Sequence, residues 1–369
     1  FSDPGPVFHT IVSIKNDGHY FCRAGGNRPD GLNEPVTGNQ VMVKIHILDA
    51  GHGDCLLVDC DGVKLLIDAG PSTFRYRKKI SAKLAELLNG ESVDIAFVTH
   101  NDDDHIGGFK YLIENKINIK RFVFNSLSNI KHVIKNSSNK ISTKQDINLD
   151  RIVKDGSFVF STLTSDDSPI LIRNIKITPI TPSKNILLKY LEQQERKNTE
   201  IKISSSSEKY SIKEALQLLS NGNDMFVKDP SATNKTSLSF MIEYGNFCGL
   251  FLGDAHEEDI YSYMANHCAN RKISFNVVKL AHHGSEKNTS SRLLKLIGTT
   301  EYIICANKTK HNHPNNLTLA RILIHEQEPK IHMSSSNQEI INLLNQINLL
   351  GFGITATHSE NGVNTLIYE

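Results

Sequence analysis

One stretch decides how this chain is interpreted: THNDDDHIGG at residues 99–108, with two histidines and three aspartates within six positions. Residues 93–98 directly before it are mostly apolar and β-prone, which predicts a buried strand. We expect the potential metal ligands to follow along a roughly extended loop, in the order His100, Asp102, Asp104 and, at the start of the next turn, His105. Carboxylates this close repel one another by several kcal/mol inside a protein, so burying them requires a cation. The alternative is a solvated acidic turn.

Two later stretches repeat the combination of an apolar strand followed by potential ligands. Residues 247–252 predict one strand, and Asp254 follows it. Residues 275–281 predict another, and His282 and His283 follow it. Loops at the carboxyl ends of neighbouring strands converge while the sheet holds them in place. We therefore expect three strand ends to deliver histidine and aspartate to one metal site.

This set of motifs resembles the metallo-β-lactamase superfamily, and within it the branch that includes the hydrolase domain of ComEC-type DNA-uptake proteins. The matching segments come in the family's order: DAGHGDCLL (49–57), KLLIDAG (64–70), NKTSL (234–238), GD (253–254), KLAHHGS (279–285), HP (313–314) and, more loosely, residues 357–362. Ala50 and His52 replace the family's usual Val and Gln in the first, glycine-rich turn. The resemblance implies a four-layer αβ/βα sandwich with metals in a groove at one edge.

The resemblance also implies two divalent metal ions. Carried over by position, the expected ligands are His100 and Asp102 for the first ion, Asp104, His105 and either His282 or His283 for the second, and Asp254 as the bridge. A third protein ligand for the first ion stays open, because Asn234 or a water could take that place. We call residues 99–108 the metal loop. Asp68 is expected to support this loop by hydrogen bonding to a ligand histidine, or else to be an ordinary turn residue.

The donor set leaves the identity of the metal open between zinc, manganese and magnesium. Asp102 stands where the family motif usually has a second histidine, so the site is richer in oxygen. Oxygen ligands shift the preference from Zn²⁺ toward Mn²⁺ or Mg²⁺. None of the six cysteines occupies an expected ligand position of the motifs, so thiolate ligation is not expected.

A pair of divalent ions about 3.5 to 4 Å apart would make hydroxide available near neutral pH and stabilise an in-line displacement. Hydrolysis is therefore the expected reaction. Asp104 would orient the attacking water or accept its proton. His313, or the histidine of the 282/283 pair that binds no metal, would protonate the leaving group, although His313 could equally be an ordinary loop residue.

The leading function is hydrolysis of a phosphodiester in nucleic acid or a nucleotide. The family resemblance supplies this substrate class, whereas the residues supply only the hydrolytic site. A phosphorylcholine-esterase-like activity is one alternative, because those enzymes share the H-x-D-x-D-H loop and the HHGS element. The chain has no Trp, which makes an aromatic cage for choline harder to build. A non-catalytic partner-binding module is the other alternative. A regulatory protein partner is compatible with an active enzyme, and the oligomeric state stays open.

The net charge of +1 offers no global argument for nucleic-acid binding, so binding must come from a local patch. The best candidate is RYRKK at residues 75–79, where Arg75, Arg77 and Lys78 could hold phosphates while the tyrosine stacks a base. A solvated helix start is the alternative. No apolar run of about 18 residues predicts a membrane span. Dispersed cysteines favour a reducing cytoplasm.

With 369 residues, of which 39% are hydrophobic, the chain can bury a large core within one elaborated domain. Residues 1–40 are predicted to be a loosely structured lead-in, and residues 41–369 the hydrolase domain. An insertion at about 126–233 would be either an active-site lid or a passive excursion. Within it, residues 170–180 predict a strand at the end of the first half-sheet.

Three helices are predicted near these motifs. The first would be capped by Ser81 and end at Asn89, because leucines recur on one face before an Asn-Gly pair. The second would cover residues 109–115, directly after the glycine pair of the metal loop. Helical periodicity predicts the third over residues 210–219.

Overall fold

The computed structural model describes residues 41–126, 149, 158–196, 208–268 and 274–369. The predicted lead-in and long parts of the predicted insertion lie outside the described residues, so the domain boundaries stay predictions. In the part of the chain that is described, the strands form one seven-stranded and one eight-stranded sheet.

The first sheet combines an antiparallel and a parallel half. Its strands, in spatial order, are β15 (Val363–Tyr368), β1 (Val43–Leu48), β2 (Leu56–Cys60), β3 (Val63–Ile67), β4 (Ile95–Val98), β5 (Arg121–Phe124) and β6 (Val159–Ser161). From β15 to β3 neighbours run antiparallel, and from β3 to β6 they run parallel. The loop with the H-x-D-x-D-H motif follows β4, at the carboxyl edge of the parallel half.

The second sheet has the same mixed design. Its order is β14 (Thr355–Thr357), β13 (Lys330–Met333), β12 (Glu301–Ile304), β11 (Val277–Lys279), β10 (Phe247–Phe251), β9 (Ser239–Tyr244), β8 (Ile175–Thr181) and β7 (Ile170–Ile172). The strands from β10 to β14 are parallel. The segments after β10, β11 and β12 therefore leave the sheet at one edge, and they carry Asp254, the 282/283 histidine pair and His313.

The assignment of residues 170–180 to the first half-sheet was wrong. These residues form β7 and β8, an antiparallel pair at the edge of the second sheet, with β8 hydrogen-bonded to β9. Alternation of apolar and polar residues indicates a half-buried strand, but it says nothing about which sheet the strand joins. The buried Ile175 and Ile177 pack between the two sheets.

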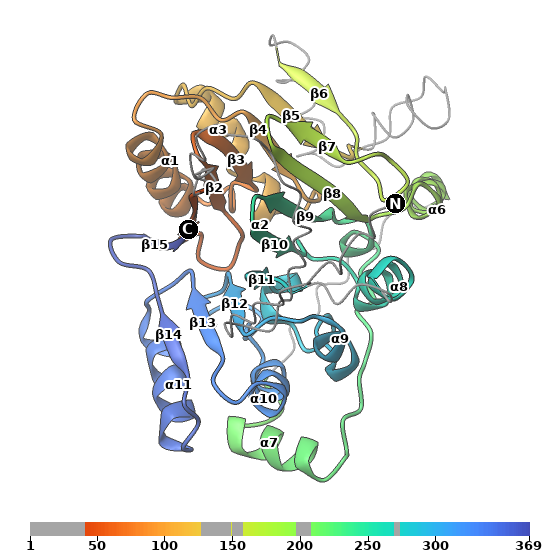
Figure 1. Ribbon diagram of the computed structural model, residues 1–369, viewed down its shortest axis with the longest axis vertical. Helices are drawn as coiled ribbons and strands as arrows, with labels where there is room; N and C mark the ends of the chain where they lie inside the picture. The colour runs from red at the N-terminus through yellow and green to blue at the C-terminus, as the bar shows by residue number, and fades with distance from the viewer. Residues whose placement is uncertain (1–40, 127–148, 150–157, 197–207, 269–273) are drawn as a thin grey trace, which may run out of the picture. The chain divides into compact units, whose positions relative to one another are not determined.

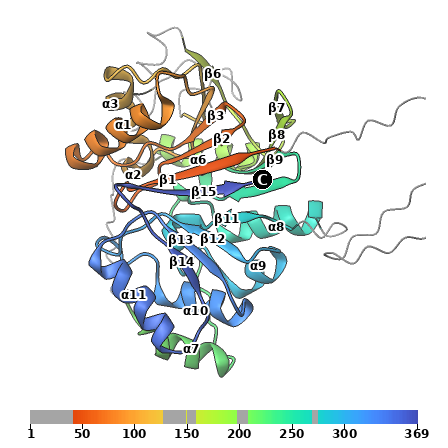
Figure 2. The same cartoon turned by 60° about the vertical axis from the view of Figure 1, so that its left-hand side comes forward.

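The sheets pack face to face, and helices cover both outer faces (Figures 1 and 2). Apolar residues from both sheets form the central core, in which the rings of Phe97 and Phe240 lie 4.5 Å apart. Two helices, α1 (Phe74–Leu88) and α3 (Phe109–Glu114), cover the first sheet. The helices that cover the second are α7 (Ile212–Ser220), α8 (Glu257–Cys268), α9 (Ser291–Leu296), α10 (Asn316–His325) and α11 (Gln338–Leu349). The predicted four-layer αβ/βα sandwich is confirmed.

The helix predicted to start at Ser81 begins earlier. Its first residue is Phe74, it ends where Asn89 adopts a left-handed conformation, and Ser81 lies buried in its interior. Arg and Lys favour helices, and the inward face that includes Ile80 and Leu84 extends the helix backwards. The basic stretch at 75–79 therefore forms the first turns of α1. The helices at 109–115 and 210–219 are confirmed as α3 and α7. None of the helices in the described residues has the length and apolar character to cross a bilayer.

Candidate metal centre

The metal loop is not extended throughout. Asp102 has extended backbone angles, but the chain then enters the short helix α2 (Asp103–Ile106). His100 and Asp102 therefore lie on an extended segment, whereas Asp104 and His105 lie on a helical turn.

Gly107 and Gly108 let α2 pack against the turn that follows β3. A Cβ atom on Gly108 would lie 2.0 Å from the carbonyl oxygen of Ala69, and one on Gly107 would lie 2.4 Å from the amide nitrogen of Ser72. The glycine pair therefore makes room for the protein's own backbone.

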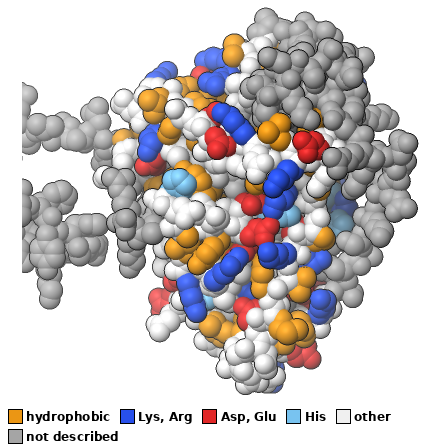
Figure 3. Space-filling view, turned by 90° about the vertical axis from the view of Figure 1, so that its right-hand side faces the viewer, with side chains coloured by type: hydrophobic (Ala, Val, Ile, Leu, Met, Phe, Trp, Pro, Cys, Tyr) orange, Lys and Arg blue, Asp and Glu red, His pale blue; other side chains and the backbone are white. Residues whose placement is uncertain are grey.

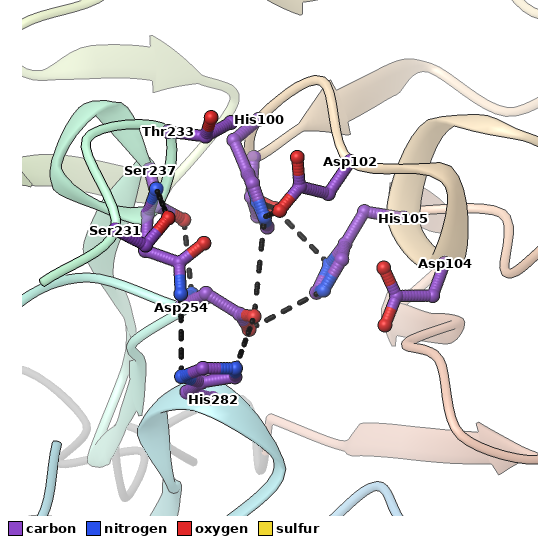
Figure 4. Close-up of polar contacts among 12 residues, drawn as sticks. His100, Asp102, Asp104, His105, Ser231, Thr233, Ser237, Asp254 and His282 are labelled. Carbon is purple, nitrogen blue, oxygen red and sulfur yellow. Dashed lines mark hydrogen bonds and ion pairs between the residues drawn. The ribbon is translucent and has the colours of Figure 1, made fainter. Parts of the chain in front are cut away.

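Side chains from the three predicted strand ends meet around Asp254. Figure 4 shows His100, His105 and His282 pointing at the Asp254 carboxylate from three sides. The Nε2 atom of His105 lies 3.3 Å from Asp254 Oδ1. The other Nε2 atoms approach Asp254 Oδ2 at 3.6 Å for His283, 3.8 Å for His282 and 3.9 Å for His100.

Asp102 and Asp104 lie on opposite sides of this centre. Asp102 Oδ2 is 3.6 Å from Nε2 of His100, and Asp104 Oδ2 is 3.3 Å from Nε2 of His283. The seven predicted ligands thus form two groups that share Asp254. We expected only one histidine of the 282/283 pair at the metals, but the structure turns both of them toward Asp254.

The backbone of the histidine pair is strained in a way that serves this arrangement. His282 and His283 have φ angles of 48° and 55°, in the left-handed region that residues other than glycine rarely adopt. Each such residue stores about 1 to 2 kcal/mol of strain. Strain of this kind concentrates at functional sites.

Each histidine is held from its Nδ1 side, so its Nε2 faces the centre. His105 Nδ1 lies 2.8 Å from Asp68 Oδ2, and His283 Nδ1 lies 2.9 Å from the carbonyl oxygen of Cys305. His100 Nδ1 lies 3.1 Å from the Thr99 hydroxyl. A partner at Nδ1 fixes the tautomer and leaves the Nε2 lone pair free for a metal.

His282 is held by a polar cluster behind it. Its Nδ1 lies 3.0 Å from Asn288 Oδ1 and 3.2 Å from Asp229 Oδ2. Asn234 donates to the same Asp229 carboxylate at 2.8 Å and approaches His282 Nδ1 at 3.2 Å. Asn234 therefore lies behind His282.

Several side-chain atoms that face the centre have no hydrogen-bond partner, and unsatisfied atoms of this kind indicate whether a metal ion fits there. Nε2 of His100, His105 and His283 and Oδ1 of Asp254 are buried and have no hydrogen-bond partner among the described residues. A buried polar atom without a partner costs about 1 to 3 kcal/mol. Divalent cations at the centre would satisfy all four atoms at once, so the donor set fits metal ions.

The electrostatics of the centre also favour positive charge. Burial alone would lower the pKa of His283, but the carboxylates of Asp254 and Asp54 outweigh it and raise the pKa to about 10. Burial alone would raise the pKa of Asp254, but His105 and His283 hold it well below its usual value. Without metal ions, protons on the histidines supply the positive charge that these carboxylates favour. Bound divalent ions would replace those protons.

Asp54 and Lys279 belong to this centre, although they were not among the predicted site residues. They form an ion pair and are 1% and 2% exposed. Asp54 also lies 3.0 Å from Nδ1 of His283 and 3.8 Å from Nδ1 of His105. Donor atoms of Asp54, His105, Asp254 and His283 all lie within 4.8 Å of one another. Asp54 nevertheless faces the Nδ1 sides, so it supports the ligands.

A sequence signal for this pair existed. Both residues lie in quoted family segments, and a lysine in an apolar strand needs a buried partner. Asp229 and Asn288 had no such signal, because they lie in irregular segments between the motifs.

His313 lies beside the histidine pair in the loop after β12. It is 8% exposed, and its ring centroid is 5.0 Å from that of His282 and 6.0 Å from that of His283. Burial, together with those two positively charged rings, holds the pKa of His313 well below its usual value. It therefore lies close to the centre in the neutral form.

The basic residues of α1 lie beside the metal loop, but their contacts are with aromatic rings. The Arg77 guanidinium stacks over Phe74 and Tyr111, 5.5 and 5.0 Å from the ring centroids, and Lys78 Nζ lies 6.0 Å from the Phe74 centroid. Arg75 is exposed. The face of the molecule in Figure 3 interleaves positive and negative side chains, in keeping with the near-neutral net charge.

Comparison with known proteins supports a superfamily assignment. Residues 48–121 match the model of the Metallo-beta-lactamase superfamily. This match covers the first strands and the metal loop, and it supports a domain of that superfamily in this chain. A search of curated proteins found no match. The narrower resemblance to ComEC-type proteins stays a prediction.

Three solved structures illustrate what the chain is similar to. The metallo-beta-lactamase fold protein YhfI from Bacillus subtilis has 12% identity and a TM-score of 0.42, over 88% of this chain and 100% of that one. Zn²⁺-bound PqqB from Methylobacterium extorquens has 12% identity and a TM-score of 0.43, over 87% and 99%. A diphosphatase from the PhnP family has 12% identity and a TM-score of 0.41, over 89% and 98%.

Proposed function

We propose that this chain is a metal-dependent phosphodiesterase that acts on nucleic acid or nucleotides through water activated by two divalent ions. One observation carries the proposal: three buried imidazole nitrogens and one carboxylate oxygen converge without partners. The superfamily match supports hydrolysis, because most of its members are metal-dependent hydrolases.

The two groups around Asp254 suggest how the ions are shared. His100, Asp102 and His282 would hold one ion, and Asp104, His105 and His283 the other, with Asp254 bridging. His282 then supplies the third protein ligand of the first ion, which removes the need for Asn234 in that role. Bound in this way, the two ions supply a nucleophilic water and stabilise negative charge on the reacting phosphate.

Asp104 is better suited to orienting the water than to accepting its proton. Burial would raise its pKa, but the neighbouring imidazoles of His283 and His105 outweigh burial and hold the pKa below its usual value. A carboxylate with a low pKa is a poor base, yet it accepts a hydrogen bond well. Asp104 would therefore fix the direction of attack.

His313 is the proposed proton donor to the leaving oxygen. In the free protein it is neutral, because burial and the neighbouring imidazoles lower its pKa. A bound phosphodiester brings negative charge, which raises the pKa of a nearby histidine. His313 would thus gain its proton together with the substrate.

The substrate class rests on the phosphate chemistry and on the first turns of α1. Ser72, just before α1, contacts Asp103 of the metal loop at 3.4 Å, so α1 begins beside this loop, and Arg75 and Lys78 are exposed in its first turns. Cations interleaved with the Phe74 ring suit a phosphate backbone and a stacked base. Manganese, magnesium and zinc all suit the mixed donor set.

The test is hydrolysis of bis-p-nitrophenyl phosphate, single-stranded DNA, double-stranded DNA and RNA with Mn²⁺, Mg²⁺ and Zn²⁺ in turn. We expect turnover of the model diester and at least one nucleic acid, abolished in the double variant Asp104→Ala with Asp254→Ala. Turnover that persists in this variant would contradict the site. Turnover of p-nitrophenylphosphorylcholine alone would favour the esterase alternative, and no turnover of any substrate would favour the non-catalytic module.

A further inference from the structure

Three segments meet at the rim of the metal centre: the turn after β1, the first turn of α1 and the loop after β12. His52 Nε2 lies 3.3 Å from Lys310 Nζ, and Tyr76 OH lies 3.3 Å from Asn307 Nδ2. The His52 and Tyr76 rings meet edge to face, with centroids 6.5 Å apart. We call these four residues the rim cluster.

Packing and hydrogen bonds hold Tyr76 and Asn307 of the rim cluster in place. Gly51 has a φ of 72°, and a Cβ atom there would lie 2.4 Å from the Tyr76 ring, so only glycine lets this ring pack against the turn. Asn307 is 5% exposed, and its amide oxygen accepts from the hydroxyl and the amide of Thr309 at 2.7 and 3.1 Å. The amide group of Asn307 is therefore directed at Tyr76.

The rim cluster adjoins the metal loop on one side and His313 on the other. A Cβ atom on Gly53 would lie 2.1 Å from the carbonyl oxygen of Asp104, so the turn that carries His52 packs directly on α2. Lys310 is three residues before His313, whose ring stacks on that of His283. A group attached to a phosphate at the metals could therefore reach the rim cluster.

The polar groups of the rim cluster suit an anion. They offer an ammonium group, a phenol, an amide group and an imidazole ring. Among the described residues no carboxylate lies within ion-pair distance of Lys310, whereas Lys308 in the same loop pairs with Glu208 at 2.9 Å. A cation without a carboxylate partner, with neutral polar groups around it, suits the charge-assisted hydrogen bonds that a phosphate group accepts.

We propose that His52, Tyr76, Asn307 and Lys310 bind a second phosphate of the substrate, next to the phosphodiester that is cleaved. This inference rests on the proposed function and sharpens it. The preferred substrates then carry a phosphate beyond the scissile one, as a polynucleotide strand or a terminally phosphorylated dinucleotide does.

The test compares dinucleotides that differ only in the second phosphate: TpT, pTpT and TpTp. We expect wild-type kcat/KM for one of the phosphorylated forms to exceed that for TpT by about tenfold or more, the effect of one charge-assisted hydrogen bond. Lys310→Gln should remove most of this preference. Tyr76→Phe, which keeps the ring against Gly51, should reduce it about two- to fivefold.

Lys330→Gln is the matched control. Lys330 is an exposed lysine at the start of β13, at the opposite edge of the sheet, and its variant should keep the wild-type preference. The second-phosphate subsite would be overturned if wild type hydrolysed TpT and both phosphorylated forms at equal rates, or if the preference survived Lys310→Gln. In either case, hydrolysis of bis-p-nitrophenyl phosphate would still uphold the proposed function. Failure to hydrolyse any phosphodiester would overturn both.

Discussion

Asp68 and His105 are hydrogen-bonded in the interior of the sandwich, with Asp68 Oδ2 2.8 Å from His105 Nδ1 and both side chains fully buried. The amide and hydroxyl of Thr99 also donate to Asp68, at 2.8 and 2.7 Å. Thr99, directly after β4, thus fixes the Asp68 carboxylate, and this carboxylate fixes the His105 imidazole. The sequence motif KLLIDAG therefore contributes Asp68 to the candidate metal centre as the residue that positions His105.

Asp68→Asn should weaken metal binding without unfolding the protein. The amide keeps the shape of the carboxylate but loses its charge, and loss of such a supporting carboxylate lowers metal affinity about 10- to 100-fold. Titration of the metal-free protein against a competing chelator measures this change. Glu243→Gln, an exposed change on β9, is the control, and equal affinities for both variants would rule out the supporting role of Asp68.

Lys279→Met should destabilise the fold through Asp54. In the native protein burial would raise the pKa of Asp54, but the charges of Lys279 and of the neighbouring imidazoles together outweigh burial and lower the pKa to about 2. Removing the buried ammonium leaves the Asp54 carboxylate without its main countercharge. Breaking a buried ion pair on one side costs about 3 to 5 kcal/mol. Urea unfolding of the metal-free proteins measures the loss.

The double variant Lys279→Met with Asp54→Asn separates stability from metal binding. It should regain most of the lost unfolding free energy, because no unpaired charge remains buried. Its metal affinity should stay low, because Asp54 no longer holds His283 from behind. Full recovery of both properties would show that the pair has no part in the metal centre.

Asp224→Asn should destabilise the protein in a pH-dependent way. Arg321 is 1% exposed, and its guanidinium donates three hydrogen bonds to the Asp224 carboxylate, at 2.7, 3.2 and 3.3 Å. Burial raises the pKa of Asp224, but the bond from Arg321 outweighs it and lowers the pKa below its usual value. The expected loss near neutral pH is about 2 to 4 kcal/mol, because a buried arginine loses its partner.

The sign of the pH effect follows from the lowered pKa. The carboxylate contributes its full stability above the unfolded-state pKa of about 3.9, and this contribution disappears as pH falls through the lower folded-state pKa. Unfolding free energies of wild type and Asp224→Asn should therefore differ at pH 7 and converge below about pH 4. A constant difference from pH 7 down to acid would exclude this ion pair as the cause.

Arg75→Gln together with Lys78→Gln should weaken nucleic-acid binding and flatten its salt dependence. Each lost phosphate contact lowers the slope of log affinity against log salt by about 0.7 to 0.9. Fluorescence anisotropy with a labelled oligonucleotide at several salt concentrations measures the slope. Lys176→Gln on β8 of the second sheet is the control, and a slope equal to that of the control would remove the α1 residues from the substrate path.

The convergence of the proposed ligands could be predicted because these residues follow strands whose carboxyl ends share an edge. That rule and the motif order placed His100, Asp254 and His283 together, as the structure does. The sequence could not show that both His282 and His283 face Asp254, because this depends on two consecutive left-handed backbone conformations. A left-handed backbone conformation at a residue other than glycine leaves no signal in composition or periodicity.

The residues that position the proposed ligands could be predicted only where a sequence motif contains them. Asp68 was predicted as a support because it ends an apolar strand within a family segment. Asp229 reaches His282 from an irregular segment, and only the tertiary structure brings the two together. The position of β8 was mispredicted for a related reason, since strand pairing is a long-range choice that local alternation does not encode.

The central claim is that the groups around Asp254 bind a pair of divalent ions. The most direct measurement is the metal stoichiometry of the purified protein, by elemental analysis after loading metal-free protein with Mn²⁺ or Zn²⁺ and removing excess. The account predicts about two ions per wild-type chain, and fewer than one per chain of the double variant Asp104→Ala with Asp254→Ala. A wild-type protein that retains no ion, or a double variant that retains both, would contradict it.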